Sequence, residues 1–266
     1  MSYKFDLKNK TKIMGILNIT PDSFSDGGNF FTLEKAINRA KQIEFEGADI
    51  IDIGAQSTRP GFTQISADEE WLRLEPVLKN LNLNIPISID TFYPEVAQKC
   101  LELYNVDIIN DVTGCEDPKM LPLIAKYNRA VIITHNKPDM NIKEFFKKKL
   151  KDAQKLKIKS SQICFDPGIG FYKSQADDAY IIRNLKNIKL KNHACLVGLS
   201  RKRIIGVACG NPPPKERLAG TIAANTICIS GGANILRVHD VKEAVQAVKV
   251  ADYILKEEKA NEQYNY

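Results

Sequence analysis

The chain has 266 residues, of which 44% are hydrophobic and 26% are charged, so its composition fits one large folded domain and excludes an intrinsically disordered chain. The formal net charge of +6 is modest, and much of the lysine lies in residues 143–160. We expect that run to be a solvated helix face, not a nucleic-acid interface, because it lacks an interleaved aromatic platform. No stretch approaches the ~20 apolar residues of a membrane helix, and residues 1–10 lack the apolar core of a secretion signal. We therefore expect a cytoplasmic protein that binds neither nucleic acid nor membrane.

The cysteines are expected to be reduced and to pack as small hydrophobic side chains. They show no C-x-x-C pairing, and three of the six, Cys164, Cys195 and Cys228, lie inside apolar runs. No cluster of His, Cys or Glu has the spacing of a zinc site.

Short β-branched apolar runs alternate with longer helical patterns along the chain, which is typical of strand–helix units around a parallel sheet. The expected strands are residues 12–17, 49–53, 86–89, 106–110, 130–134, 162–165, 194–199 and 233–238. Among the expected helices, residues 33–47 have apolar residues at steps of three and four and end in glycine, and residues 67–81 are acidic in the first turn. Eight such units predict a single (β/α)8 TIM barrel over residues 1–266, with a short amino-terminal extension at residues 1–11.

The segments that follow the expected strands are polar, charged and rich in glycine. In chain order they read NITPDSFSDGG, GAQSTRPG, DTF, NDVTG, HNKP, DPGIGF, SRKR and HD. Because a TIM barrel builds its active site from the residues after the carboxyl ends of its strands, these segments predict the active site at that end.

Two carboxylates, an amide and an ammonium group are expected to converge over the barrel mouth. They are Asp90, Asn110, Asp166 and Lys202. Carboxylates that accept paired N–H groups suit the amidine-like edge of a flat heterocycle, and a lysine can donate to a ring oxygen or nitrogen. The alternative is that these groups form buried ion pairs or cap helices.

A second group of side chains at the strand exits is cationic: Arg59, Arg201, Arg237 and His239. Arginine matches phosphate oxygens bidentately, and the last strands of such barrels often form a phosphate site, so we expect a polyphosphate ligand. Arg237 and His239 are two residues apart and are expected to share one face of a strand, although His239 could also be purely structural. Asn18 could give an amide oxygen to Mg²⁺, which prefers oxygen ligands and bridges phosphates.

Seven motifs together resemble one family, the dihydropteroate synthases of folate synthesis, across almost the whole chain. They are MGILNITPDSFSDGG, GADIIDIGAQSTRPG, SIDT, NDVTG, DPGIGF, VGLSRK and LRVHDV, in family order. The resemblance implies a transferase that condenses 6-hydroxymethyl-7,8-dihydropterin diphosphate with 4-aminobenzoate, giving 7,8-dihydropteroate and diphosphate. It also implies Mg²⁺ as cofactor, a homodimer, and a target for sulfonamide-type mimics of aminobenzoate.

The resemblance further implies a role for individual residues. The pterin would be held by Asp90, Asn110, Asp166, Lys202 and Phe171. The diphosphate would be held by Asn18, Arg59, Arg237 and His239, with Asn18 also on the metal, and the aminobenzoate by Phe24, Thr58, Pro60 and Ser200. The residues expected to carry catalysis are Asn18, Asp90, Lys202 and Arg237.

The reaction is expected to be dissociative: diphosphate leaves first, and no nucleophilic side chain is needed. Residues 18–28 and 55–61 are expected to be mobile loops. The first would act as a lid, stiffened by Pro21 at one end and freed by Gly27 and Gly28 at the other.

The chain departs from the family pattern in three places. Thr134, His135 and Asn136 stand where a Met-His-Met-like exit is usual, and Arg203 stands where a small residue is common. The segment 137–160 is short, so we expect a trimmed fifth helix.

Two other functions stay open at this point. A methyltetrahydrofolate-type methyltransferase would keep the pterin residues but need no diphosphate site, and a pterin binder could have lost activity. Residues 219–233, a helical pattern of small residues, could pack within the barrel's outer ring or against a partner.

Overall fold

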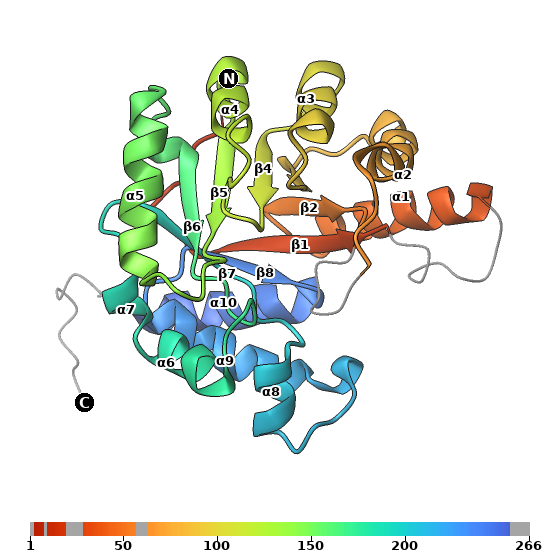
Figure 1. Cartoon of the computed structure of the whole chain (residues 1–266). Coiled ribbons are helices and arrows are strands. Elements are labelled where there is room, and N and C mark those ends of the chain that lie inside the picture. The colour runs from red at the N-terminus through yellow and green to blue at the C-terminus, as the bar shows by residue number, and fades with distance from the viewer. Residues whose placement is uncertain (1–2, 8–9, 20–28, 57–62, 256–266) are drawn as a thin grey trace, which may run out of the picture.

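The strands close into an eight-stranded parallel barrel, in which each pairs with its neighbours in the sequence and the last pairs with the first (Figure 1). The computed structural model describes residues 3–7, 10–19, 29–56 and 63–255, without the side chains of residues 29–32. The strands are β1 (Lys12–Asn18), β2 (Ile50–Gly54), β3 (Ile87–Asp90), β4 (Ile108–Asp111), β5 (Ala130–Thr134), β6 (Ile163–Asp166), β7 (Ala194–Val197) and β8 (Ile235–Val238). This arrangement confirms the predicted TIM barrel.

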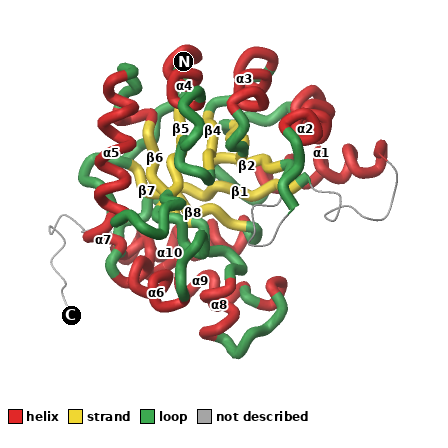
Figure 2. Tube along the Cα trace, in the orientation of Figure 1, coloured by secondary structure: helices red, strands yellow, loops and turns green. Residues whose placement is uncertain are grey.

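Helices surround the barrel, as Figure 2 shows by the red coils outside the yellow strands. They are α1 (Asn29–Phe45), α2 (Ala67–Asn80), α3 (Pro94–Leu103), α4 (Met120–Tyr127), α5 (Ile142–Lys155), α6 (Gln175–Arg183), α7 (Leu185–Ile188), α8 (Arg203–Ala208), α9 (Leu218–Ser230) and α10 (Val241–Leu255). Side-chain caps start several of them: Ser66 accepts from the backbone N–H of Glu69 at α2, and Asn141 caps α5. Among the helices of the described residues, none is long and apolar enough to span a bilayer.

Several strands extend further toward their carboxyl ends than their apolar content predicts. Asn18, Gly54, Asp90 and Asp166 are each the last residue of a strand, where we expected loop residues. The backbone ladder continues through them because pairing uses main-chain groups, whatever the side chain. Their side chains are therefore held on rigid elements.

The core has two layers separated by the strands. One cluster lies between strands and helices. The other fills the barrel and contains Met14, Ile50, Ile108, Cys164 and Ile235 together with Phe5. Phe5 is buried, and its backbone N–H donates to the carbonyl of Ser161, so the segment before β1 packs against the barrel.

Two segments bear on expectations from the sequence. Helix α5 has 14 residues, as many as α2, and its shortening relative to other family members stays a prediction. Helix α9 packs on α10, α6 and α8, which confirms that one face of this small-residue helix belongs to the outer ring.

All six cysteines are free thiols, five of them buried, and Cys209 alone is exposed.

Candidate active site

Strand alternation brings the expected site residues into the barrel mouth. Successive side chains of a strand point to opposite faces, so residues two apart share a face. Ile50, Ile108, Cys164 and Ile235 fill the interior. The residues two positions further toward the carboxyl ends are Asp52, Asn110, Asp166 and Arg237. The site therefore forms a polar layer at the carboxyl ends of the strands, next to the apolar side chains that fill the barrel interior.

Arg237 is the centre of a buried ionic network. Its Nε lies 2.6 Å from Oδ2 of Asp52, and its Nη2 lies 2.7 Å from Oδ2 of Asp90. Oδ2 of Asp52 also accepts from the amide nitrogen of Asn110 at 3.0 Å. Side chains across the barrel interior thus join strands β2, β3, β4 and β8. Asp90 therefore takes part in a buried ion pair, which is the alternative that the sequence left open.

The network leaves acceptors unused. Among the described residues, Oδ1 of Asp90 and Oδ1 of Asp52 are buried and have no hydrogen-bond partner. Unpaired buried acceptors are costly, so a ligand N–H that reached them would be stabilised.

Burial and neighbouring charge shift the pKa values of this network. Burial raises the pKa of Asp90 to about 7, the Arg237 guanidinium opposes this, and the Asp52 carboxylate adds to it. Burial by itself lowers the pKa of Arg237. The carboxylates of Asp52 and Asp90 raise this pKa by more than burial lowers it, so it lies above its ordinary value. Arg237 therefore remains a cation, and the charge of Asp90 depends on what lies beside it.

The exit of β6 and the segment after β7 form the other side of the mouth. Oδ1 of Asp166 accepts from the backbone N–H of Gly168 at 2.7 Å. The Lys202 ammonium donates to the carbonyl of Ile169 and lies 4.8 Å from the ring centroid of Phe171. Burial lowers the pKa of Lys202 to about 8, while the Asp166 carboxylate opposes the shift.

Asp166 and Arg237 lie close together, as the expected site requires. A Cβ placed on Gly198 would lie 3.7 Å from Cβ of Arg237 and 4.0 Å from Oδ2 of Asp166. The charges of Lys202 and Arg237 both act on the carboxyl group of Asp166, although burial raises its pKa. Asp90, Asn110, Asp166, Lys202 and Arg237 thus share one site.

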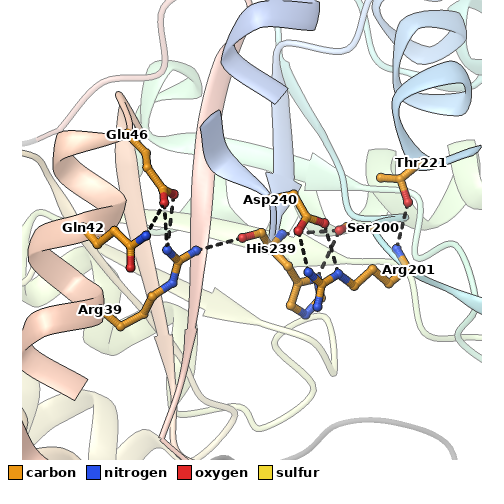
Figure 3. Close-up of polar contacts among 8 residues, drawn as sticks. All are labelled: Arg39, Gln42, Glu46, Ser200, Arg201, Thr221, His239 and Asp240. Atoms are coloured by element: carbon orange, nitrogen blue, oxygen red, sulfur yellow. Dashed lines mark hydrogen bonds and ion pairs between the residues drawn. The ribbon is translucent and has the colours of Figure 1, made fainter. Parts of the chain in front are cut away.

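A cavity of about 530 Å³ lies beside this site, between the ends of β1 and β8. Its lining includes Asn18, the basic residues Arg39, Arg201 and His239, and the acidic residues Glu46, Asp240 and Glu243. His239 contacts Ser200, and the guanidinium of Arg201 is paired with the carboxylate of Asp240 (Figure 3). Two residues expected in the anion site therefore line the same cavity, whereas Arg237 faces Asp52 and Asp90.

Four expected site residues, Phe24, Thr58, Arg59 and Pro60, lie outside the described residues, as do residues 20–28 of the expected lid and most of the second loop.

The exits of β5 and β6 are held together by a lysine that the motifs did not single out. The Lys173 ammonium donates to the carbonyls of His135, Gly168 and Phe171 at 2.9–3.1 Å. Asn136, one of the expected departures from the family pattern, donates to the carbonyl of Val112 at 3.0 Å. This amide joins the exits of β4 and β5.

Sequence reasoning missed several buried acids, among them Asp52 and Glu70. Asp52 interrupts an apolar run, and a charged residue inside an expected strand was the signal that could have identified it. Glu70 of α2 has no such signal, because it sits in an acidic first turn. It accepts from Oγ1 of Thr91 at 2.8 Å and from Nε2 of Gln56 at 3.3 Å, which joins the exits of β2 and β3. Burial raises the pKa of Glu70 to about 7.

A closed (β/α)8 barrel with buried carboxylates, an amide, a lysine and an arginine at its mouth is typical of an enzyme that binds a polar heterocycle there. The family model described as pterin binding enzyme matches residues 14–239. The chain belongs to this family.

Its relatives are more specific. A dihydropteroate synthase from Bacillus subtilis (strain 168) is 40% identical over 258 residues, covering 93% of this chain and 90% of the relative. The crystal structure of dihydropteroate synthase from Clostridium difficile in the presence of pteroic acid matches with a TM-score of 0.90 and 44% identity, covering 94% of this chain and 99% of that one. Dihydropteroate synthase from Xanthomonas albilineans with 4-aminobenzoic acid matches with a TM-score of 0.88 and 35% identity, covering 96% and 98% of the two chains. The expected family is thereby confirmed.

Proposed function

We propose that the chain condenses 6-hydroxymethyl-7,8-dihydropterin diphosphate with 4-aminobenzoate, and that the side chains at the barrel mouth carry the reaction. The activity is that of a dihydropteroate synthase, a transferase of folate biosynthesis. The relatives that match over most of their length support this assignment. The observation of the structure that carries it is that two buried carboxylate oxygens lie unpaired beside a buried arginine at the barrel mouth.

The pterin binds between Asp90 and Lys202. Asp166 and Asn110 hold the amino-pyrimidine edge, and Asp90 accepts the dihydropyrazine N–H through Oδ1. Lys202 donates to the ring carbonyl or nitrogen, and Phe171 packs beside the ring. The unpaired Oδ1 of Asp90 and the position of the Lys202 ammonium 4.8 Å from the Phe171 ring support these roles.

The diphosphate binds to Arg237, His239, Arg59 and Asn18. The cavity lined by Asn18 and His239 supports this assignment, because it lies next to the strand that carries Arg237. When the substrate binds, the Arg237 guanidinium would contact the diphosphate as well as the carboxylates of Asp52 and Asp90.

Mg²⁺ fits the donor set at the end of β1. Asn18 lines the cavity and its side chain has one neutral amide oxygen, and Mg²⁺ is commonly held by few protein oxygens together with waters and substrate phosphates. When bound, the ion supplies positive charge to the diphosphate. Among the described residues, no group of three or more His, Cys, Asp or Glu is placed to hold a metal.

The chain's own residues then favour bond cleavage before amine attack. Arg237 stabilises negative charge on the departing diphosphate, and Asp90, through the N–H it accepts, stabilises positive charge on the pterin. The neutral aminobenzoate amine, framed by Phe24, Thr58 and Pro60, then forms the C–N bond without a nucleophilic side chain, and its proton passes to water or to the released diphosphate. Ser200, also expected there, has His239 as its partner.

The decisive experiment is a product assay. The purified chain is incubated with Mg²⁺, the dihydropterin diphosphate and 4-aminobenzoate; we expect equal amounts of dihydropteroate and diphosphate, and none with Arg237→Met. A methyltransferase would fail to bind diphosphate, and an inactive binder would bind the pterin and give no product. Either result would refute the proposal.

We also propose that residues 1–266 form a single domain, that the protein is a homodimer, and that it works in the cytoplasm. Sedimentation of the purified protein tests the dimer, since a monomer at working concentration would contradict it.

A further inference from the structure

His239 is held from two sides by groups far away in the sequence. Its backbone carbonyl accepts from Nη2 of Arg39 on α1 at 2.9 Å. Its ring Nδ1 lies 3.0 Å from Oγ of Ser200, and its backbone N–H donates to the same Oγ at 3.3 Å. Figure 3 shows His239 between Arg39 and Ser200. The position of both the backbone and the ring is thus fixed.

The Ser200 hydroxyl decides where the imidazole carries its proton. A hydroxyl has one hydrogen to donate and two lone pairs to accept with, and Ser200 is only 6% exposed. One lone pair is taken by the backbone N–H of His239. Within the described part of the chain, Nδ1 of His239 is the one acceptor found for the hydroxyl hydrogen. The hydroxyl therefore donates to Nδ1, and the neutral ring carries its hydrogen on Nε2.

Two carboxylates that line the cavity with His239 are paired with arginines. Asp240 is bound by Arg201 through two guanidinium nitrogens. Glu46 is bound by Nη1 of Arg39 at 3.1 Å and 3.3 Å and by Nε2 of Gln42 at 2.7 Å. Both acids are thus paired to arginines (Figure 3), and Glu243 also lines the cavity.

We infer that Ser200 is a positioning residue that fixes neutral His239 as an Nε2–H donor for an anionic ligand in the cavity lined by Asn18, Arg201 and His239. The inference rests on the proposed function, in which this cavity takes the diphosphate. The opposite tautomer would carry a lone pair on Nε2 and repel the phosphate oxygens. Ser200 would thus act through His239, not on the aminobenzoate.

Nuclear magnetic resonance can read the tautomer directly, because the chain has three histidines. The other two are internal references. Nε2 of His135 lies 2.9 Å from the carbonyl of Met140, and Nδ1 of His193 lies 3.0 Å from the carbonyl of Lys191, so the two rings carry their hydrogens on opposite nitrogens. In long-range ¹H–¹⁵N spectra of the free protein at about pH 8, where imidazoles are ordinarily neutral, we expect the His239 pattern to match His135. A match to His193 would overturn the inference.

A double-mutant cycle tests whether Ser200 acts through His239. Ser200→Ala should mix the His239 tautomers and weaken the binding of inorganic diphosphate about tenfold. It should have no further effect in the His239→Ala background, and a further loss there would overturn the inference. Unchanged His135 and His193 signals show that the variants are folded. If the wild type does not bind diphosphate at all, the proposed function fails, whereas the tautomer of His239, read without ligand, still decides the role of Ser200.

Discussion

The Nε atom of Arg237 lies 2.6 Å from Oδ2 of Asp52, although 185 residues separate them along the chain. Strand β8 pairs with β1 and β7, and β2 pairs with β1 and β3. The ion pair therefore crosses the barrel interior instead of joining neighbouring strands. The orientation of Arg237 depends on this contact.

Asp52→Asn is expected to destabilise the protein by about 3 kcal/mol, because it removes a buried counter-charge, and to raise KM for the diphosphate substrate. Asp252→Asn is the control, since its carboxylate accepts from Thr11 at 2.9 Å outside the site. Its loss should be about 1 kcal/mol, with KM unchanged. Urea denaturation and steady-state kinetics measure both effects, and equal behaviour of the two variants would contradict the role of Asp52.

Asp90→Asn is expected to lower kcat about 100-fold while pterin affinity falls much less, because the carboxylate charge matters most when the pterin becomes cationic. Asp111→Asn is the comparison, since its buried carboxylate accepts from the backbone N–H and hydroxyl of Thr113. That variant should lose stability and keep most of kcat. Equal losses of kcat and pterin affinity in Asp90→Asn would instead indicate a role in binding alone.

Pterin affinity is expected to fall as the pH rises through about 8, because burial lowers the pKa of Lys202 to about 8 and only the protonated amine donates as a cation. Lys202→Arg should move this inflection out of the accessible range, since guanidinium stays charged. Lys202→Met should lower the affinity at every pH and remove the inflection. Titration calorimetry between about pH 6 and 10 measures this; an inflection that survives in Lys202→Met would assign it to another group.

Glu70 should make the protein less stable as the pH rises. Its folded pKa is raised from 4.5 to about 7 by burial, so the folded state binds the proton more tightly than the unfolded state. The free energy of unfolding therefore falls between about pH 4.5 and 7. Relative to Glu70→Gln, the wild type should lose about 3 kcal/mol across this range, measured by urea denaturation. A difference that is constant with pH would show that Glu70 is ionised throughout.

Gly168→Ala and Gly210→Ala form a matched pair. Both glycines have positive φ, +69° and +81°, so both substitutions carry a backbone strain of about 1 kcal/mol. A Cβ on Gly168 would lie 2.1 Å from the carbonyl oxygen of His135, whereas one on Gly210 would meet no described atom within 4 Å. Gly168→Ala should therefore cost several kcal/mol and weaken pterin binding, since Gly168 donates to Asp166. Equal stability losses would contradict the assigned close approach.

The sequence by itself determined the barrel and most of its mouth. Apolar runs at regular intervals predict eight strands, and strand alternation predicts that Asn110, Asp166 and Arg237 face inward, because both patterns depend on neighbours a few residues apart. Strand ends were less predictable, since polar residues such as Asp90 still pair through their backbone.

Only the tertiary structure decided which charges meet. Asp52 and Arg237, Glu70 and Thr91, and Ser200 and His239 belong to different strand–helix units, and no local pattern relates them. Closing the barrel brings these groups together in a buried space, where an unpaired charge or hydroxyl hydrogen is costly. That cost selects the partners, and Oδ1 of Asp52 and Oδ1 of Asp90 are among the buried atoms of the described residues that have none.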